Sequence, residues 1–250
     1  MNLTHEAMGT VVSLDLRCEA PQSVVARAFE IFDEADARFS PFRPESELAR
    51  VSRGALPRGD ASAELLEVLE LADAFDRASG GVFSVWRDGA LDANGVVKGW
   101  AAQRAADALR DGGVTDFCLN AGGDVIARGV PAPGRRWQAG IRHPEHAERL
   151  IGVVVLGEAA LATSGGYERG AHIVDARTGA ASDHWSSISV IDTDLTVADV
   201  LATTVFAMGA DGPAWAHEEF GSTVIAVDAG GGLSVSGHVE WARPERGLHG

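Results

Sequence analysis

The sequence predicts an α+β fold: one domain over residues 1–250, with mixed or antiparallel sheets packed against helices. Helical and strand-like segments are grouped in some regions and interleaved in others, unlike the regular alternation of a parallel α/β sheet. The 250 residues are 46% hydrophobic, which is enough to bury a substantial core. The chain has no internal repeat and no low-complexity linker. Two closely packed lobes, with a boundary near residues 80–95, would also fit this pattern.

The individual elements follow from the period of the apolar residues and from the turn residues between them. Apolar side chains at three- and four-residue spacing predict helices, which begin at residues suited to capping and end at glycines. The predicted helices are 21–37, a short turn at 46–51, a helix capped by Asp60 or Ser62 and ending at Gly80, then 97–112, 197–208 and 214–220. The predicted strands are 10–16, 114–119, 125–127, 137–141, 150–156, 188–191, 223–227 and 233–235.

The formal net charge of −15 argues against two classes of partner. Nucleic acid and anionic membrane surfaces would be repelled at most approaches, so we expect neither as a partner and no membrane insertion. A small anionic ligand would need a bound cation, a nearby lysine or backbone amides to offset the acidic field.

The N-terminus and the cysteines predict a cytoplasmic protein. Residues 1–6 have neither the basic segment nor the apolar run of a signal peptide, and no stretch approaches transmembrane length. Cys18 and Cys118 are far apart, so we expect two reduced core residues and no disulfide.

Four glycine-bearing segments are candidates for ligand contact, because glycine lets backbone groups approach a ligand closely. They are residues 95–99, 120–124, 163–167 and 172–179. None has the spacing of a dinucleotide fingerprint or a P-loop, and each alone is also what an ordinary turn requires. Lys98 in the first segment is either a solvated lysine near a helix start or a ligand contact; the helix dipole disfavours a cation there, which favours the second reading.

Asp199 and Thr203 are four residues apart on one side of a predicted helix, so their oxygens can converge on a hard divalent cation such as Mg²⁺. Alternatively, Asp199 caps or opens its helix and Thr203 bonds back to a carbonyl. His172 lies between apolar neighbours and is either a structural histidine or a catalytic base. Neither the cysteines nor the histidines have zinc spacing, and Ser164 lacks the context of a nucleophile elbow.

Taken in order, the motifs resemble the ApbE-type family of FAD:protein FMN transferases. The resemblance is carried by residues 8–10, 39–40 with 46–48, 79–83, 98–100, 120–124, Trp137 with 140–141, 163–169, 172–179 and 198–203. It implies an ApbE-like domain that uses Mg²⁺ to transfer FMN from FAD to a Ser or Thr hydroxyl of an acceptor flavoprotein, releasing AMP.

The resemblance also implies a role for individual residues. Asp199, Thr203 and the Gly95 carbonyl would hold the Mg²⁺, and His172 would be the catalytic residue. Contacts to FAD would come from Met8, Phe42, Val82, Phe83, Asp92, Lys98 and Ile173, with Ser84 where the family usually has aspartate.

The chain departs from the family pattern on the flavin side. The segment between Phe83 and Asp92 is much shorter than usual, and Phe42 replaces a common tyrosine. Two alternatives therefore stand beside the transferase: hydrolysis of FAD to FMN and AMP, and FAD binding without catalysis.

Overall fold

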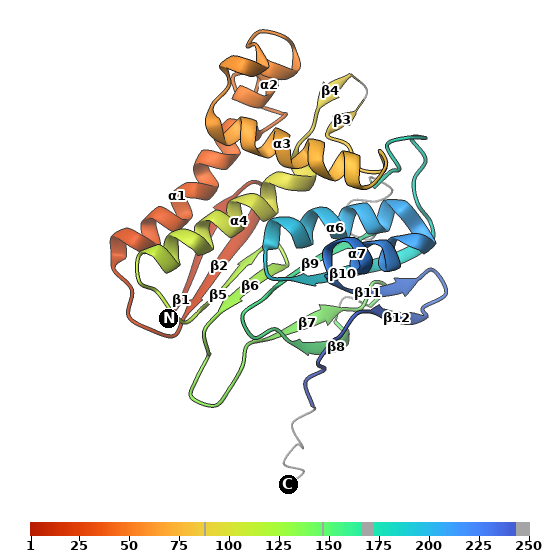
Figure 1. Ribbon diagram of the computed structural model, residues 1–250. Helices are drawn as coiled ribbons and strands as arrows, with labels where there is room; N and C mark the ends of the chain where they lie inside the picture. The colour runs from red at the N-terminus through yellow and green to blue at the C-terminus, as the bar shows by residue number, and fades with distance from the viewer. Residues whose placement is uncertain (88, 147, 167–172, 244–250) are drawn as a thin grey trace.

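A computed structural model describes residues 1–87, 89–146, 148–166 and 173–243 (Figure 1). Its centre is an eight-stranded antiparallel sheet of order β1-β2-β5-β6-β9-β10-β11-β12. The strands are β1 (Asn2–Ala7), β2 (Thr10–Leu16), β5 (Phe117–Ala121), β6 (Asp124–Arg128), β9 (Ala160–Gly165), β10 (Trp185–Asp192), β11 (Thr223–Asp228) and β12 (Leu233–Ser236). This arrangement confirms the predicted α+β fold.

Helices cover one face of this sheet (Figure 1). They are α1 (Gln22–Phe39), α4 (Asn94–Asp111), α6 (Leu195–Met208) and α7 (Gly212–Phe220). Beyond the sheet lie α2 (Glu47–Ser52), a 3₁₀ turn (Arg58–Asp60), α3 (Ala63–Ala78) and a ribbon of β3 (Trp86–Arg87) and β4 (Ala90–Leu91). The main hydrophobic core lies between helices and sheet, and it includes Val82, Phe83 and Leu91 from the region where two lobes could have separated.

A smaller sheet covers part of the opposite face. It consists of β7 (Gln138–Arg142) and β8 (Leu150–Val155). A second core between the two sheets contains Trp137, Ile141 and Val154 from this region, packed with Leu161 and Ile225 of the large sheet. Both faces of the central strands are therefore buried, which explains why every residue of β6 is buried.

Most predicted elements are present, with boundary shifts. Four strands escaped prediction: β3 and β4 have only two residues each, and the other two are longer. The first, β1, is an edge strand with no buried residue, so it lacks an apolar pattern. The second, β9, has the sequence ALATSG, whose small residues read as a loop although most are buried. Helix α4 begins at Asn94, earlier than the predicted Val97.

Serine side chains cap two of the predicted helices. Ser46 Oγ accepts a hydrogen bond from the Ala49 amide at 3.1 Å, and Ser62 Oγ accepts one from the Leu65 amide at 3.3 Å. The second observation settles the choice between Asp60 and Ser62, because Asp60 belongs to the preceding 3₁₀ turn.

Both cysteines are free and partly buried, as predicted. Cys118 lies opposite Asp15 in the β2–β5 pair, and burial, with a smaller effect of Asp15, raises the pKa of its thiol to about 11. The thiol form therefore prevails at neutral pH.

One described helical stretch, Leu195–Phe220, is long and apolar enough to cross a membrane by length and composition, which the sequence analysis did not anticipate. The fold buries 61% of its most apolar window, and a short 3₁₀ turn divides it into α6 and α7. Its apolar composition is that of a core helix packed on a sheet.

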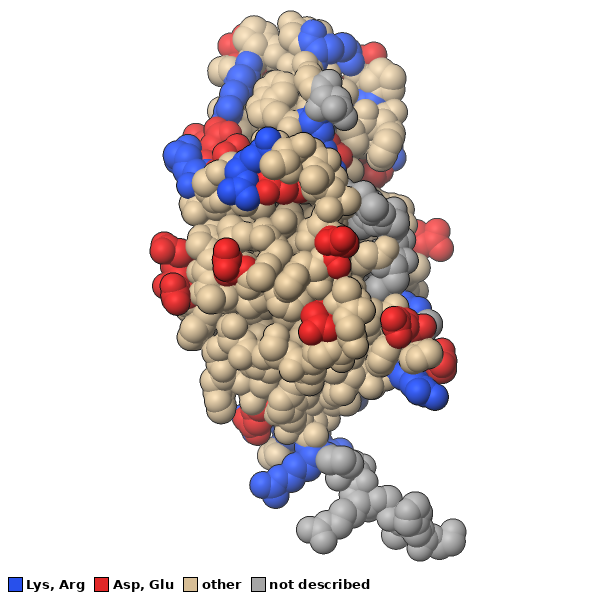
Figure 2. Space-filling model, turned by 90° about the vertical axis from the view of Figure 1, so that its right-hand side faces the viewer, with Lys and Arg blue, Asp and Glu red and all other residues tan. Residues whose placement is uncertain are grey.

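Figure 2 shows the charged side chains on one face of the molecule. Acidic side chains lie there in several separate groups, and Lys and Arg side chains lie mainly toward the upper and lower ends of the view. The acidic groups on this face do not merge into one patch.

Helices α4 and α6 touch at Gly99, which gives the first testable prediction. A Cβ atom at Gly99 would lie 2.7 Å from both Asp199 Cβ and the Leu195 carbonyl oxygen, too close for either to be accommodated without backbone movement. We expect Gly99→Ala to lower the free energy of unfolding by about 1–3 kcal/mol, measured by urea denaturation. Gly59→Ala, where a Cβ would meet nothing within 4 Å, is the matched control. Equal stability of the two variants would contradict this account of the helix contact.

Candidate active site

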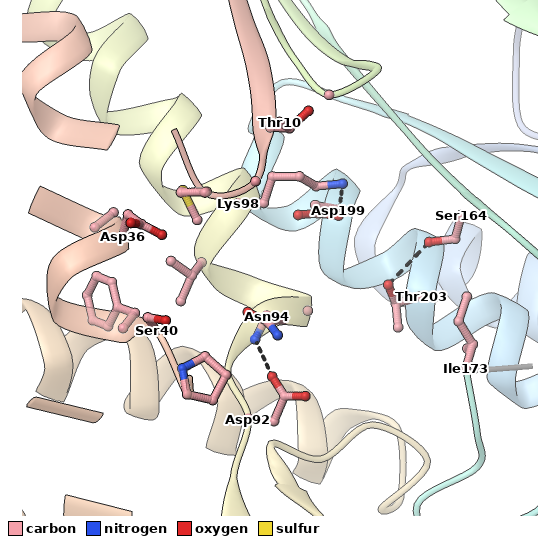
Figure 3. Close-up of a pocket in the computed structure, with 18 of the residues that line it drawn as sticks. Thr10, Asp36, Ser40, Asp92, Asn94, Lys98, Ser164, Ile173, Asp199 and Thr203 are labelled. Carbon is pink, nitrogen blue, oxygen red and sulfur yellow. Dashed lines mark hydrogen bonds and ion pairs between the residues drawn. The ribbon is translucent and has the colours of Figure 1, made fainter. Parts of the chain in front are cut away.

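A cavity of about 630 Å³ opens where the turns of two hairpins meet the helix layer. Its walls come from the β1–β2 turn, the loop after α1, the segment after Phe83, the first turns of α4, and the middle of α6 (Figure 3). Most residues predicted for the site line it, namely Met8, Phe42, Phe83, Ser84, Asp92, Gly95, Lys98, Ile173, Asp199 and Thr203.

Two predicted residues are not in this lining. Val82 is buried below the surface of the cavity, and its carbonyl accepts a hydrogen bond from the Ala176 amide at 3.0 Å. His172, the predicted catalytic residue, lies outside the described residues.

Asp199 is a buried residue inside its helix and not a cap. Helix α6 is capped by Asp194, whose Oδ1 accepts hydrogen bonds from the amides of Thr196 and Val197. The capping alternative for Asp199 is therefore wrong. Asp199 is 4% exposed, and its Oδ2 accepts a hydrogen bond from the Gly99 amide at 2.9 Å. This bond joins α6 to α4.

Lys98 also points toward Asp199, and it is not a solvated lysine. Its Nζ lies 3.5 Å from Asp199 Oδ1 and 2.5 Å from Asp124 Oδ2 (Figure 3 shows the first pair). The side chain of Asp124 is 2% exposed. One ammonium thus lies between two buried carboxylates, which supplies local positive charge to a cavity of an acidic chain.

Burial raises the pKa of the Asp199 carboxyl to about 7. Lys98 opposes this shift, and the negative charge of Asp124 adds to it. Burial outweighs the single lysine, so the Asp199 carboxylate gains stability from any further cation close to it.

Thr203 lies one turn further along α6, and its hydroxyl faces the sheet. Its Oγ1 and Ser164 Oγ are 3.2 Å apart (Figure 3). The threonine that bonds back to a carbonyl is its neighbour Thr204, whose Oγ1 donates to the Val200 carbonyl at 2.7 Å. The hydroxyl of Thr203 is thus hydrogen-bonded to Ser164, and both residues line the cavity.

Gly95 lies in the first turn of α4, directly below Phe83. A Cβ at Gly95 would lie 3.2 Å from Phe83 Cε2, so the glycine allows the ring to pack against the helix start. In a regular helix the Gly95 carbonyl accepts from the Gly99 amide. That amide donates to Asp199, and a carbonyl has two lone pairs, so the Gly95 oxygen can accept a further partner.

The oxygen-rich donor set matches a hard cation and no softer metal. The described residues contain no group of three or more His, Cys, Asp or Glu side chains placed to hold a metal. Asp199, Thr203 and the Gly95 carbonyl offer oxygen only, and all three line one cavity. Mg²⁺ prefers such ligands and completes its coordination with phosphate and water.

The segment after Phe83 forms a wall of the cavity. Ser84, Arg87 and Asp92 line it, and Asp92 Oδ1 accepts a hydrogen bond from the Asn94 amide at 3.0 Å just before α4 (Figure 3). Phe83 makes an edge contact with Phe75 of α3. On the opposite side, the Phe42 side chain is 86% exposed at the rim of the cavity.

Sequence reasoning did not assign several residues in or beside this cavity. Asp36, Ser40 and Ser164 line it but were not singled out as contacts, and Asp124, which pairs with Lys98 behind the lining, was seen only as part of a glycine motif. The signal for Asp124 was an acidic residue opening a strand whose next three residues are apolar. A buried carboxylate needs a charged or hydrogen-bonding partner. The partner here, Lys98, lies 26 positions away in the sequence, so the local pattern around Asp124 did not indicate it.

The raised pKa of Asp199 predicts a pH-dependent stability in the absence of a cation. Its folded pKa of about 7 exceeds its ordinary value of 3.8, so the folded state binds the extra proton. This group's contribution to stability is full below about pH 4 and is lost as the pH rises to 7. In EDTA, Asp199→Asn should therefore be more stable than the wild type at pH 8, by more than about 1 kcal/mol, and the difference should shrink at pH 5. Urea denaturation at both pH values measures it; an equal difference at both would contradict the raised pKa.

Known proteins with a similar sequence align with part of this chain. A protein named FAD:protein FMN transferase from Vibrio cholerae is 30% identical over 129 residues, which cover 48% of this chain and 39% of the relative. A protein of the same name from Klebsiella pneumoniae is 33% identical over 131 residues, which cover 48% of this chain and 40% of the relative. The matched region thus spans well under two thirds of each relative.

Solved structures match almost the whole chain. The flavin transferase ApbE of Vibrio cholerae has a TM-score of 0.80 at 20% identity, covering 94% of this chain and 96% of that one. The ApbE protein of Thermotoga maritima has a TM-score of 0.82 at 22% identity with the same coverage. These likenesses establish the fold. Because the ApbE family model also matches residues 8–89 and 85–227, this chain belongs to the ApbE family.

Proposed function

We propose that this chain transfers the FMN half of FAD to a serine or threonine hydroxyl of an acceptor flavoprotein and releases AMP. One observation carries the proposal: a single cavity joins an apolar wall, a lysine and three oxygen donors for a hard cation. Its volume of about 630 Å³ is within the range of small-molecule sites. The name of the curated relatives supports the same activity.

FAD would lie along the cavity from the β1–β2 turn to α6. Met8, Phe83 and Ile173 offer apolar contact to its rings, and Phe42 at the rim offers an exposed aromatic face. Val82 supports this wall from behind. Ser84 and Asp92 offer polar contacts, and the Lys98 ammonium would bind phosphate oxygens.

Asp199, Thr203 and the Gly95 carbonyl would hold Mg²⁺ beside the diphosphate. Bound there, Mg²⁺ would neutralise phosphate charge and make AMP a better leaving group. The support is chemical: oxygen donors only, and a buried carboxylate that a second cation would stabilise.

The transfer step needs an activated hydroxyl. The acceptor oxygen forms a bond to the FMN phosphorus, the bond from this phosphorus to the oxygen that it shares with AMP breaks, and AMP leaves. We propose that His172 takes the hydroxyl proton, because neutral imidazole is a suitable base near pH 7. The product is a phosphoester-linked flavin.

Incubation with FAD, Mg²⁺ and a panel of candidate acceptor flavoproteins tests the proposal. We expect covalent flavin fluorescence on a denaturing gel and an equal amount of AMP. Asp199→Ala should lower both by about 100-fold or more, because charge stabilisation of this kind contributes on that order. His172→Ala should lower transfer while FAD still binds in a titration. Asp192→Asn, which changes a carboxylate outside the cavity, is the control.

The same assay separates the two alternatives. Free FMN and AMP without labelled protein would indicate FAD hydrolysis. Binding of FAD without release of AMP would indicate a binding protein and would contradict any catalytic role.

The turn that carries Met8 leads to a prediction about both stability and FAD binding. Met8 is the only described non-glycine residue with positive φ, at 52°, and with Gly9 it forms a two-residue turn of the type that favours Asn-Gly. We expect Met8→Asn to raise the free energy of unfolding by about 1 kcal/mol and to weaken FAD binding. Met8→Ala keeps the backbone strain, so it should weaken FAD binding without the gain in stability. If FAD affinity were unchanged in both variants, Met8 would not be a contact of FAD.

A further inference from the structure

The carboxylate of Asp124 is buried, and each of its two oxygens lies beside a polar group. It is the first residue of β6, immediately after the Gly122-Gly123 turn. Its Oδ1 accepts a hydrogen bond from the Thr163 amide at 3.0 Å, and its Oδ2 lies 2.5 Å from Lys98 Nζ. The hydrogen bond from the Thr163 amide fixes the carboxylate to β9. The position of Asp124 therefore determines where the Lys98 ammonium lies.

The turn before Asp124 is equally constrained. Gly122 and Gly123 have φ of 64° and 106°, and a Cβ at Gly122 would lie 2.6 Å from Thr10 Oγ1. Asn120 Oδ1 accepts a hydrogen bond from the Gly123 amide at 2.9 Å. The glycine motif thus sets the position of the acid that follows it.

Lys98 also forms a longer ion pair with Asp199. Its Nζ lies 3.5 Å from Asp199 Oδ1, one ångström further than from Asp124 Oδ2. Without the Asp124 charge, the ammonium could pair more closely with Asp199. An ammonium bound closely to Asp199 would compete with a divalent cation for this carboxylate, and the two cations would repel each other.

We infer that Asp124 is a positioning residue that draws the Lys98 ammonium toward itself, so that the ion pair between Lys98 and Asp199 stays the longer of the two and Asp199 remains available to a divalent cation. This inference rests on the proposed function, because it assumes that Asp199 binds the cation. It assigns to Asp124 a role that acts through Lys98, with no contact between Asp124 and the cation.

Mn²⁺ binding to the EDTA-treated protein, followed by the electron paramagnetic resonance signal of free Mn²⁺, tests the inference without catalysis. Asp124→Asn keeps an oxygen for the Thr163 amide, but its amide nitrogen cannot accept from an ammonium. Lys98 should then turn to Asp199, and Mn²⁺ affinity should fall by about 10-fold or more. Asp192→Asn, whose carboxylate binds Ser222 and the Asp194 amide away from the cavity, should bind Mn²⁺ as the wild type does.

The double variant Asp124→Asn/Lys98→Met tests whether Asp124 acts through Lys98 or directly on the cation. It removes the competing ammonium, so its Mn²⁺ affinity should return to at least that of the wild type. It removes both members of the Lys98–Asp124 ion pair together and leaves Asp199 as the buried carboxylate that the cation would bind, and thermal unfolding checks that the variant folds. In the AMP assay, raising Mg²⁺ should recover most of the activity lost in Asp124→Asn.

Two results would overturn the inference alone: unchanged Mn²⁺ affinity in Asp124→Asn, or a double variant that binds as weakly as Asp124→Asn. The second would mean that the Asp124 charge acts on the cation directly. Failure of the wild type to bind Mn²⁺ would overturn the proposed cation site, and this inference with it.

Discussion

The contact between α4 and α6 at Gly99 is the constraint on which the site depends. Only a residue without a side chain allows the helices to approach so closely that the Gly99 amide reaches the Asp199 carboxylate. The same approach brings Gly95 and Lys98 of α4 to one cavity with Asp199 and Thr203 of α6. The close packing of these two helices therefore determines where the polar groups of the cavity lie.

Negative charge exceeds positive charge around Lys98. Two buried carboxylates face one ammonium, in a chain whose net charge is −15. Burial keeps the pKa of Asp199 high despite the lysine. A carboxylate in this state favours any additional cation, and a ligand carrying a diphosphate would gain from the same cation.

The aromatic side of the cavity combines a buried wall with an exposed rim. Phe83 is buried between Gly95 and Phe75, whereas Phe42 projects from a loop that Arg43 holds by an ion pair to Asp36. The segment after Phe83 closes this side of the cavity with Ser84 and Arg87.

The sequence by itself determined what depends on local pattern: the α+β class, the amphipathic helices and the motif order that identifies the family. It also predicted that Asp199 and Thr203 share a helix face, since four-residue spacing has that consequence in any α-helix. It could not reveal β1 and β9, because a polar edge strand and a strand of small residues lack an apolar alternation. Only the tertiary structure paired Lys98 with Asp124 and bonded Gly99 to Asp199, contacts between segments 26 and 100 residues apart. Such contacts arise from how sheet and helices pack, and no local period in the sequence encodes them.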